Sequence, residues 1–320
     1  MYKLIRIFNQ NRKRILLIVL IIVFIVILIQ LLNFIEKNNN NKENIVSNNV
    51  NVSNFDNNKE ITSDKSLISG DTVSESKLNE DADIINNFLK FCNNGNIEEA
   101  YELISQDCKD VMFQTIDEFN KIYYDSLFNG KNRIYTIQNW TNDTYKINFN
   151  ENYISTGDKS IESSQVDYIT IVEDSDGTKK LNINSFIGKE KLDKDIDYNN
   201  ILVKAQFLYK FVDYCEISFN ITNNTYRTIL MDDLSNPYTI YIEDNNGMKY
   251  YAYTNELVTE RLKLGINQST QTNIKFYSKY SSSKKIKKAV FSKVINNVET
   301  YESVKEKSQY NQYYAIEVKI

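Results

Sequence analysis

The stretch NNFLKFCNNGNIEEAYELIS, residues 86–105, decides the fold of the first half of the chain. Within it and just before it, apolar residues recur at the spacing of one helical face: Ile84, Ile85, Phe88, Leu89 and Cys92. The pattern stops at Asn94 and Gly95, a typical C-terminal end of a helix. Asn96 is suited to cap a second helix, whose first turn carries two glutamates. The stretch therefore predicts two consecutive helices joined by a short glycine turn.

A third helix and a set of strands are predicted downstream. The helix begins at about Thr115, the expected cap with Glu118 three residues later, and ends at Gly130. After it the hydrophobic period falls to two, which is typical of strands. The predicted strands cover residues 133–137, 144–150, 166–173 and 179–186. Helices followed by an antiparallel meander indicate an α+β domain over residues 80–190.

Residues 15–35, ILLIVLIIVFIVILIQLLNFI, form an apolar run interrupted only by Gln30 and Asn33. A helix of this length measures about 31 Å, which matches a hydrocarbon core of about 30 Å. Residues 1–14 carry basic and no acidic side chains, which predicts a cytoplasmic tail. A cleaved signal peptide and a buried core helix are the alternatives, but the run is too long for the first and too uninterrupted for the second. The sequence thus predicts an uncleaved transmembrane signal anchor with the lipid bilayer as its partner, in the cell membrane, with residues 36–320 extracytoplasmic.

Composition sets further limits on structure and partners. Residues 36–79 are polar and rich in Asn, Ser, Asp and Glu, which predicts a disordered stalk. The net charge is −4 and the tail of residues 1–14 carries +5, so the remainder is near −9. This acidic balance argues against nucleic acid as a partner.

The chain contains no histidine, which excludes Ser/His/Asp and Cys/His catalysis and histidine zinc sites. Its three cysteines, Cys92, Cys108 and Cys215, are an odd number without metal-binding spacing. Each falls on an apolar face, so buried free thiols are expected, with a bridge between Cys92 and Cys108 as the alternative.

Residues 86–105 also resemble the opening of the nuclear transport factor 2-like superfamily. There a helix, a short Asn-Gly turn and a second helix precede a curved sheet that forms a cone. The resemblance covers residues 80–190 and implies a helix-first, cone-like domain. That superfamily contains enzymes such as ketosteroid isomerases and many binding and scaffolding domains. Combined with one N-terminal span, the arrangement is similar to that of inner-membrane assembly factors of type IV secretion and conjugation systems.

Residues 197–320 are predicted to form an antiparallel β-sandwich, after the charged connector GKEKLDKDIDYNN at 188–200. Short strands are expected at 213–222, 226–231, 238–243, 248–254, 272–277, 289–294 and 315–320. The N-x-T turn within ISFNITNNTY, the hairpin EDNNGMK and the bend LKLG resemble immunoglobulin-like modules of exported Gram-positive proteins. The bend lacks the proline usual in those modules.

Candidate sites are few. An isomerase-like reaction would need a carboxylate facing a tyrosine inside the cone. Tyr123, Tyr124, Asp125 and Tyr135 are the candidates for such a pocket, and Trp140 for its mouth; structural packing is the alternative interpretation of all five.

Lys284, Lys285, Lys287 and Lys288 are candidate contacts to an anionic surface, with solvated strand or turn positions as the alternative. Tyr250, Tyr251 and Tyr253 could supply an interaction face. The acidic turns at 173–177 and 243–247 lack the ligand spacing of a calcium loop and are expected to be hairpin turns. Adjacent Asp232 and Asp233 point to opposite faces of a strand and are interpreted as a strand end.

The sequence therefore predicts an α+β chain with a transmembrane helix and a C-terminal β-sandwich, without catalytic, cofactor or metal residues. The predicted function is that of a membrane-anchored binding or scaffold protein of an envelope or secretion-type assembly, with a protein partner. Homo-oligomerisation stays open. The alternative hypothesis is a small-ligand sensor or isomerase-like enzyme that uses the cavity of the α+β domain, which would need a deep apolar pocket.

Overall fold

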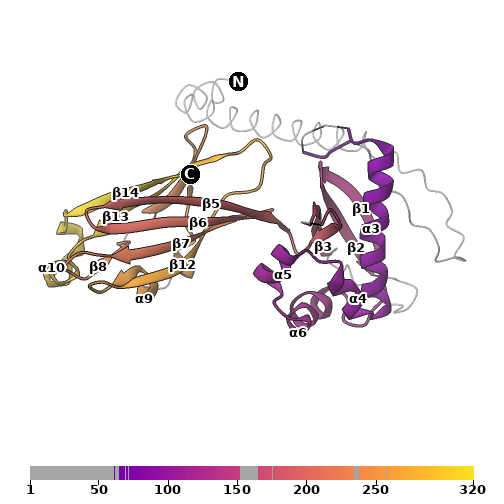
Figure 1. Ribbon diagram of the computed structural model, residues 1–320, viewed down its shortest axis with the longest axis horizontal. Coiled ribbons are helices and arrows are strands. Elements are labelled where there is room, and N and C mark those ends of the chain that lie inside the picture. Colours follow the sequence, from indigo (N-terminus) through magenta and orange to yellow (C-terminus); the bar gives the residue numbers. More distant parts are fainter. Residues whose placement is uncertain are drawn as a thin grey trace, which may run out of the picture. The chain divides into compact units, whose positions relative to one another are not determined.

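A computed structural model describes residues 61, 65–68, 70, 72–151, 165–174, 176–233, 238–257 and 259–320 (Figure 1). The chain divides into two units, Met1–Asn57 and Asn58–Ile320, and the described residues belong to the second. The predicted tail at 1–14, the apolar run at 15–35 and most of the predicted stalk lie outside the described residues.

No helix within the described residues is both long and apolar enough to cross a membrane. This finding corrects the predicted fold class and localisation, both of which depended on a transmembrane helix. The described part of the chain thus gives no support to the predicted signal anchor or to the extracytoplasmic placement.

The first half of the described chain begins with one long helix. α3 (Glu75–Asn94) starts at Ser74, whose side chain accepts a hydrogen bond from the Lys77 N–H, and it ends at Gly95. Gly95 has a φ of 73°, the left-handed conformation in which glycine carries no Cβ penalty. The helices that follow are short: α4 (Ile97–Glu102), α5 (Gln106–Met112), α6 (Ile116–Phe119), a π-helical turn (Asn120–Tyr124) and α7 (Asp125–Leu127).

These helices cover one face of a four-stranded antiparallel sheet. Its strands are β1 (Arg133–Thr141), β2 (Thr144–Glu151), β3 (Gln165–Glu173) and β4 (Lys179–Asn182), paired in that order. Alternate residues of β2, such as Tyr145, Ile147 and Phe149, are buried in one core with Ile85 and Phe88 of α3. Figure 1 shows α3 running along this sheet.

Both edges of this sheet are partly paired by the chain itself. At β1, the backbone N–H groups of Leu67 and Ile68 donate to carbonyls of residues 139 and 140 at 3.1 and 3.2 Å, and Ile61 forms a parallel bridge with Ile137. At β4, the Leu181 N–H donates to the Leu103 carbonyl at 2.9 Å. The described residues of the predicted stalk therefore include a segment that lies along β1.

The second half consists mainly of two antiparallel sheets. One contains β5 (Phe186–Tyr198), β6 (Ile201–Phe211), β7 (Cys215–Asn223) and β12 (Ser269–Phe276), in the order β12-β7-β6-β5. The other contains β8 (Ile229–Leu230), β9 (Ile240–Asp244), β10 (Lys249–Tyr251), β11 (Lys263–Leu264), β13 (Ile286–Ile295) and β14 (Tyr313–Lys319). Short helices include α9 (Thr259–Leu262) and α10 (Val298–Ser303), with 3₁₀ turns at Thr254–Glu256 and Lys307–Gln309.

The two sheets enclose one apolar core. Phe219 of β7 and Phe291 of β13 meet there edge to face, with ring centroids 5.2 Å apart. Asn220 and Ser292, which follow them in the two strands, are only partly buried, as the alternation of a pleated strand predicts.

The predicted fold class is wrong in a second respect. Among the described residues 44% lie in strands and 25% in helices, so this part of the chain is mainly antiparallel β structure and its helices do not form the predicted cone-like opening. The charged connector at 188–200 is largely strand β5. Leu192 and Ile196 of this strand pack on the core, and the charged residues around them are tolerated because β5 is an edge strand.

Candidate functional site

The structure does not bring the predicted pocket residues together. Tyr123 and Tyr124 of the π-helical turn are buried in the core of the first half, whereas Asp125 is exposed. The Tyr135 hydroxyl donates to the Asn86 side chain at 2.9 Å. Trp140 lies in a separate cluster with Ile187 and Val212.

Tyr123 faces a carboxylate that the sequence interpretation missed. Its hydroxyl donates to Asp167 Oδ2 at 2.8 Å. Backbone N–H groups of Tyr168, Asn184 and Ser185 also donate to Asp167, at 2.7 to 3.2 Å. Burial raises the pKa of Asp167 to about 6, against the opposing effect of these four donors. The sequence contains a signal for this buried position: Asp167 lies on the same face of the strand as Ile169 and Ile171, which are buried.

Aromatic rings fill the space around this pair. Phe119 and Tyr123 stack with centroids 5.6 Å apart, and Phe113 meets both rings edge to face. Phe88, Phe128 and Phe149 complete the cluster, and each is 2% exposed or less. The carboxylate is occupied by four donors inside a packed aromatic core. Its role is therefore to hold neighbouring parts of the fold together, and it is not accessible to a substrate.

A surface hollow of about 250 Å³ lies elsewhere, next to the first turn of α5. Its lining includes Asp107, Glu173, Asp174 and Lys189. The Lys189 ammonium already pairs with Asp107 at 3.2 Å. Among the residues that the structure describes, no cluster of acidic or cysteine side chains is arranged to hold a metal ion.

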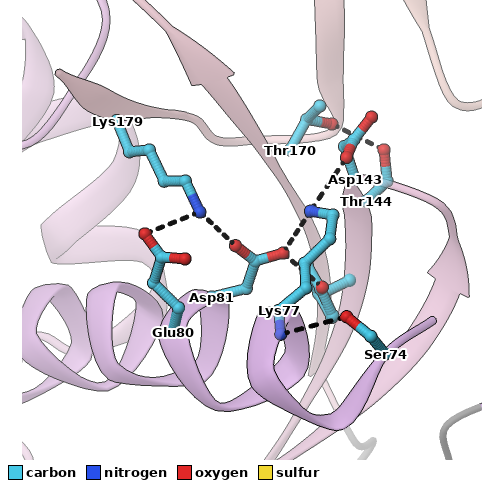
Figure 2. Close-up of polar contacts among 9 residues, drawn as sticks. Ser74, Lys77, Glu80, Asp81, Asp143, Thr144, Thr170 and Lys179 are labelled. Atoms are coloured by element: carbon cyan, nitrogen blue, oxygen red, sulfur yellow. Dashed lines mark hydrogen bonds and ion pairs between the residues drawn. The ribbon is translucent and has the colours of Figure 1, made fainter. Parts of the chain in front are cut away.

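A second buried carboxylate, Asp81, joins α3 to the sheet (Figure 2). Its side chain is fully buried and accepts from Lys77 Nζ and from the Tyr145 hydroxyl, both at 2.6 Å, and from Lys179 Nζ at 3.1 Å. Burial acts to raise the pKa of Asp81, but these three donors outweigh it and hold the pKa below its usual value. Figure 2 shows that each lysine also contacts a second carboxylate. Lys77 pairs with Asp143 and Lys179 pairs with Glu80, both at 3.0 Å. Every oxygen of Asp81 is thus used within the fold.

Asp232 and Asp233 form a third buried acidic group, just after β8. Asp232 accepts from the Thr239 hydroxyl, and Asp233 accepts from the Tyr301 and Tyr313 hydroxyls at 2.8 and 2.5 Å. Both side chains are 1% exposed or less. Burial and the neighbouring Asp233 raise the pKa of Asp232 to about 6.

This raised pKa makes stability depend on pH in a defined direction. The folded chain binds a proton at Asp232 more tightly than the unfolded chain, whose aspartate value is 3.8, so folding stability falls as pH rises from about 4 to about 6. Asn carries no proton to lose, so we expect Asp232→Asn to abolish this fall in stability. At pH 7 the gain in the free energy of unfolding should be up to about 3 kcal/mol. Urea unfolding between pH 4 and pH 8 measures it.

The matched control is Asp213→Asn, because the Asp213 side chain is 73% exposed. The control should follow the pH profile of the unaltered chain. The prediction is wrong if Asp232→Asn gives a profile parallel to that of the unaltered chain.

The predicted lysine contacts are divided between two environments. Lys288 pairs with Glu243 and Glu317 at 3.5 and 3.0 Å. Lys284 lies over the Tyr250 ring and donates to Ser278 Oγ at 3.1 Å. Only Lys285 and Lys287 of the four are exposed. The cluster therefore presents two outward ammonium groups rather than four.

Both acidic turns lie in β-hairpins. Gly177 and Gly247 have φ values of 81° and 78° and lie in the turns of the β3–β4 and β9–β10 hairpins, which confirms the hairpin interpretation.

Cys92, Cys108 and Cys215 are free and buried, so the predicted free thiols are confirmed and the bridge is not formed. Burial raises the pKa of Cys108 and Cys215 to about 12, which makes these thiols poor nucleophiles.

The most distinctive surface feature is a row of six tyrosines, here called the tyrosine row: Tyr214, Tyr238, Tyr241, Tyr251, Tyr253 and Tyr277. Tyr251 contacts Tyr238 and Tyr241, with centroids 5.0 and 5.8 Å apart. Tyr253 stacks on Tyr277 at 3.4 Å and meets Tyr214 at 6.5 Å.

The local backbone explains why these rings share one surface. Ala252, between Tyr251 and Tyr253, is buried and forms a bridge with Phe276, so its two neighbours point outward. The Tyr277 N–H donates to the Tyr251 carbonyl, and the Tyr253 N–H donates to the Lys275 carbonyl. Residues 251–253 therefore connect both sheets, and the tyrosine row crosses from one sheet to the other.

Two features make the tyrosine row available for contact. Tyr238 and Tyr277 are 66% and 58% exposed. None of the six hydroxyls donates a hydrogen bond to any residue that the structure describes, whereas the hydroxyls of Tyr123, Tyr145 and Tyr250 all do. Lys275 lies between two of the rings, 4.0 Å from the Tyr214 centroid and 4.8 Å from that of Tyr253.

Comparisons with known proteins supply no family. The chain matches no protein-family model, and no curated protein is significantly similar to it in sequence. A matching solved structure is a 2.2 Å crystal structure of a conserved hypothetical protein from Bacillus anthracis, with 12% sequence identity and a TM-score of 0.22. The match covers 38% of this chain and 93% of that protein. A TM-score this low carries no argument, so the nuclear transport factor 2-like and immunoglobulin-like resemblances stay predictions.

Proposed function

We propose that this chain is a non-catalytic binding protein that recognises another protein through the tyrosine row. The observation that carries the proposal is the cluster of six tyrosines with unpaired hydroxyls across two sheets, of which Tyr238 and Tyr277 are exposed and the other four partly buried. Tyrosine is enriched in protein interfaces because its ring buries a large apolar area while its hydroxyl forms hydrogen bonds. Its two side-chain torsions also make it inexpensive to order on binding.

The alternative function, a ligand sensor or isomerase-like enzyme, has weaker support. It needs an apolar pocket with a carboxylate available to a substrate. Asp167 and Tyr123 are a desolvated carboxylate and a tyrosine in contact, but aromatic rings surround them and four donors occupy the carboxylate. We therefore favour surface recognition over internal catalysis.

The test is photocrosslinking from the tyrosine row in the source organism. Tyr277 is replaced by a photoreactive phenylalanine analogue in one strain, and Tyr226 is replaced in a second strain. Tyr226 is the matched control because it is a tyrosine that is 91% exposed and lies outside the row.

We expect the same protein to be captured repeatedly from position 277 and not from position 226. Its capture should be lost when Tyr238 is also changed to serine. Equal capture from both positions, or none from position 277, would contradict the proposal.

A further inference from the structure

We infer that the tyrosine row binds an extended, proline-rich peptide segment in the polyproline II conformation. This inference rests on the proposed function and names the class of partner segment that the row fits. It follows from three properties of the row: its hydrogen-bonding groups, the angles between its rings, and its length.

The tyrosine row presents hydrogen-bond donors that the described chain does not use. Its six hydroxyls are unpaired within the described chain, and the ammonium groups of Lys249 and Lys275 lie over rings of the row, at 4.4 Å from Tyr241 and 4.0 Å from Tyr214. Two nearby carboxylates already pair with lysines: Glu256 with Lys275 and Glu243 with Lys288, each at 3.5 Å.

A polyproline II segment has the complementary pattern. Its backbone carbonyls make no internal hydrogen bonds and remain free to accept. Its prolines have no N–H group and so require no acceptor. Such a segment is mainly an acceptor, whereas an ordinary extended strand or a glycan brings donors as well as acceptors. The unpaired hydroxyl donors of the row therefore match the free carbonyls of a proline-rich segment.

The ring angles point to the same class of partner. Tyr251 makes interplanar angles of 64° with Tyr238 and 63° with Tyr241, so these rings form angular notches instead of a common plane. Sugar rings that stack on aromatic side chains need a flat ring face, which notches interrupt. A polyproline II helix has three residues per turn and projects compact pyrrolidine rings, which fit between aromatic rings.

The length of the row corresponds to a short peptide. Tyr251 and Tyr253 are two residues apart on an extended backbone, which separates their side chains by about 6 to 7 Å. Tyr214 lies 6.5 Å beyond Tyr253, and Tyr241 lies 5.8 Å beyond Tyr251, measured between ring centroids. The row therefore extends over roughly 15 to 20 Å, which is about five or six residues of polyproline II at its rise of about 3.1 Å per residue.

The experiment measures binding of fluorescein-labelled peptides to the full-length chain by fluorescence anisotropy. The probes are a panel of proline-rich peptides of about twelve residues with acidic, neutral or basic flanks, glycine-serine peptides of equal length, and linear oligosaccharides as unlabelled competitors. The variants are Tyr238→Ser with Tyr277→Ser, the same pair changed to Phe, and Tyr226→Ser as the matched control.

We expect at least one proline-rich peptide to bind about tenfold or more tightly than the glycine-serine peptides. The serine pair should weaken this binding by about tenfold, the phenylalanine pair by less, and Tyr226→Ser not at all. Far-ultraviolet circular dichroism should show that every variant stays folded, since both exchanged tyrosines are more than half exposed.

Several results would overturn the inference. These are the absence of proline-rich binding across the panel, equal binding to the serine pair, or displacement by oligosaccharides but not by unlabelled peptide. The crosslinking experiment distinguishes failure of the peptide inference from failure of the proposed function. If position 277 captures a protein that excess proline-rich peptide does not displace, the peptide inference fails and the proposed function stands; if position 277 captures nothing, both fail.

Discussion

Replacing Asp81 by alanine is expected to lower the free energy of unfolding by about 3 kcal/mol. The Asp81 side chain is fully buried and joins α3 to β2 through Tyr145 and to β4 through Lys179, while it also pairs with Lys77 of its own helix (Figure 2). Without it, the buried Tyr145 hydroxyl loses its acceptor and each of the two ammonium groups loses one of its two anions. The cost lies at the lower end for a buried pair because both lysines are partly exposed and can reach water.

The matched control for Asp81→Ala is Glu80→Ala. Glu80 also pairs with Lys179, at 3.0 Å, but its side chain is 62% exposed, so its loss should change stability by less than about 0.5 kcal/mol. Urea unfolding at pH 7 compares the two variants. Because the pKa of Asp81 is held below 3.8, its contribution is present above that pH and fades as the pH falls through the lowered value. Equal costs for both variants would show that the Asp81 cluster does not stabilise the docking of α3.

Phe119→Ala is expected to lower the free energy of unfolding by about 3 to 5 kcal/mol. Phe119 is fully buried and its ring contacts those of Tyr101, Phe113 and Tyr123 at centroid distances of 5.6 to 5.8 Å. Removing the ring leaves a void among rigid aromatic neighbours, which cannot collapse fully into it. Urea unfolding of the variant measures the cost.

The matched control for Phe119→Ala is Ile116→Ala in the same helix. Ile116 is 38% exposed, so its truncation should cost less than about 1 kcal/mol. The void in Phe119→Ala should also bind a small apolar molecule such as benzene, which would raise the unfolding midpoint of that variant alone. If Phe119→Ala costs no more than Ile116→Ala, the core is not closely packed and the internal-pocket hypothesis regains support.

Local signals predicted several elements correctly. The alternation of Cys215, Ile217 and Phe219 predicted a strand where β7 is found, and all three side chains are buried. Thr115 was expected to cap a helix, and its hydroxyl accepts from the Glu118 N–H at 3.2 Å. Gly95 was expected to end α3 and does so. These features depend on residues close together in the chain, which a sequence displays directly.

Features that depend on distant pairing were missed. The sequence alone indicates a charged connector where the 13-residue strand β5 lies, because an edge strand with only a few core-facing apolar residues has the composition of a loop. The predicted third helix contains a π-helical turn at Asn120–Tyr124, for which no local signal exists. The balance between helix and strand in the predicted fold class was therefore wrong.

The candidate site could be predicted only in part. The sequence indicated an interaction face at Tyr250, Tyr251 and Tyr253, but strand alternation divides them: Tyr251 and Tyr253 point outward, whereas Tyr250 packs against the core and donates to Asp244. Tyr214, Tyr238, Tyr241 and Tyr277 join the row from other strands and turns. Their proximity is set by the pairing of residues 251–253 with both β9 and β12, which the sequence alone does not reveal.

The most direct test of the central claim is the affinity of the crosslinked partner for purified variants of this chain. Isothermal titration compares the unaltered chain, Tyr253→Ser with Tyr277→Ser, and Tyr226→Ser. The account predicts that the first variant loses about tenfold or more in affinity and that Tyr226→Ser matches the unaltered chain. Equal affinities for all three proteins would contradict recognition through the tyrosine row.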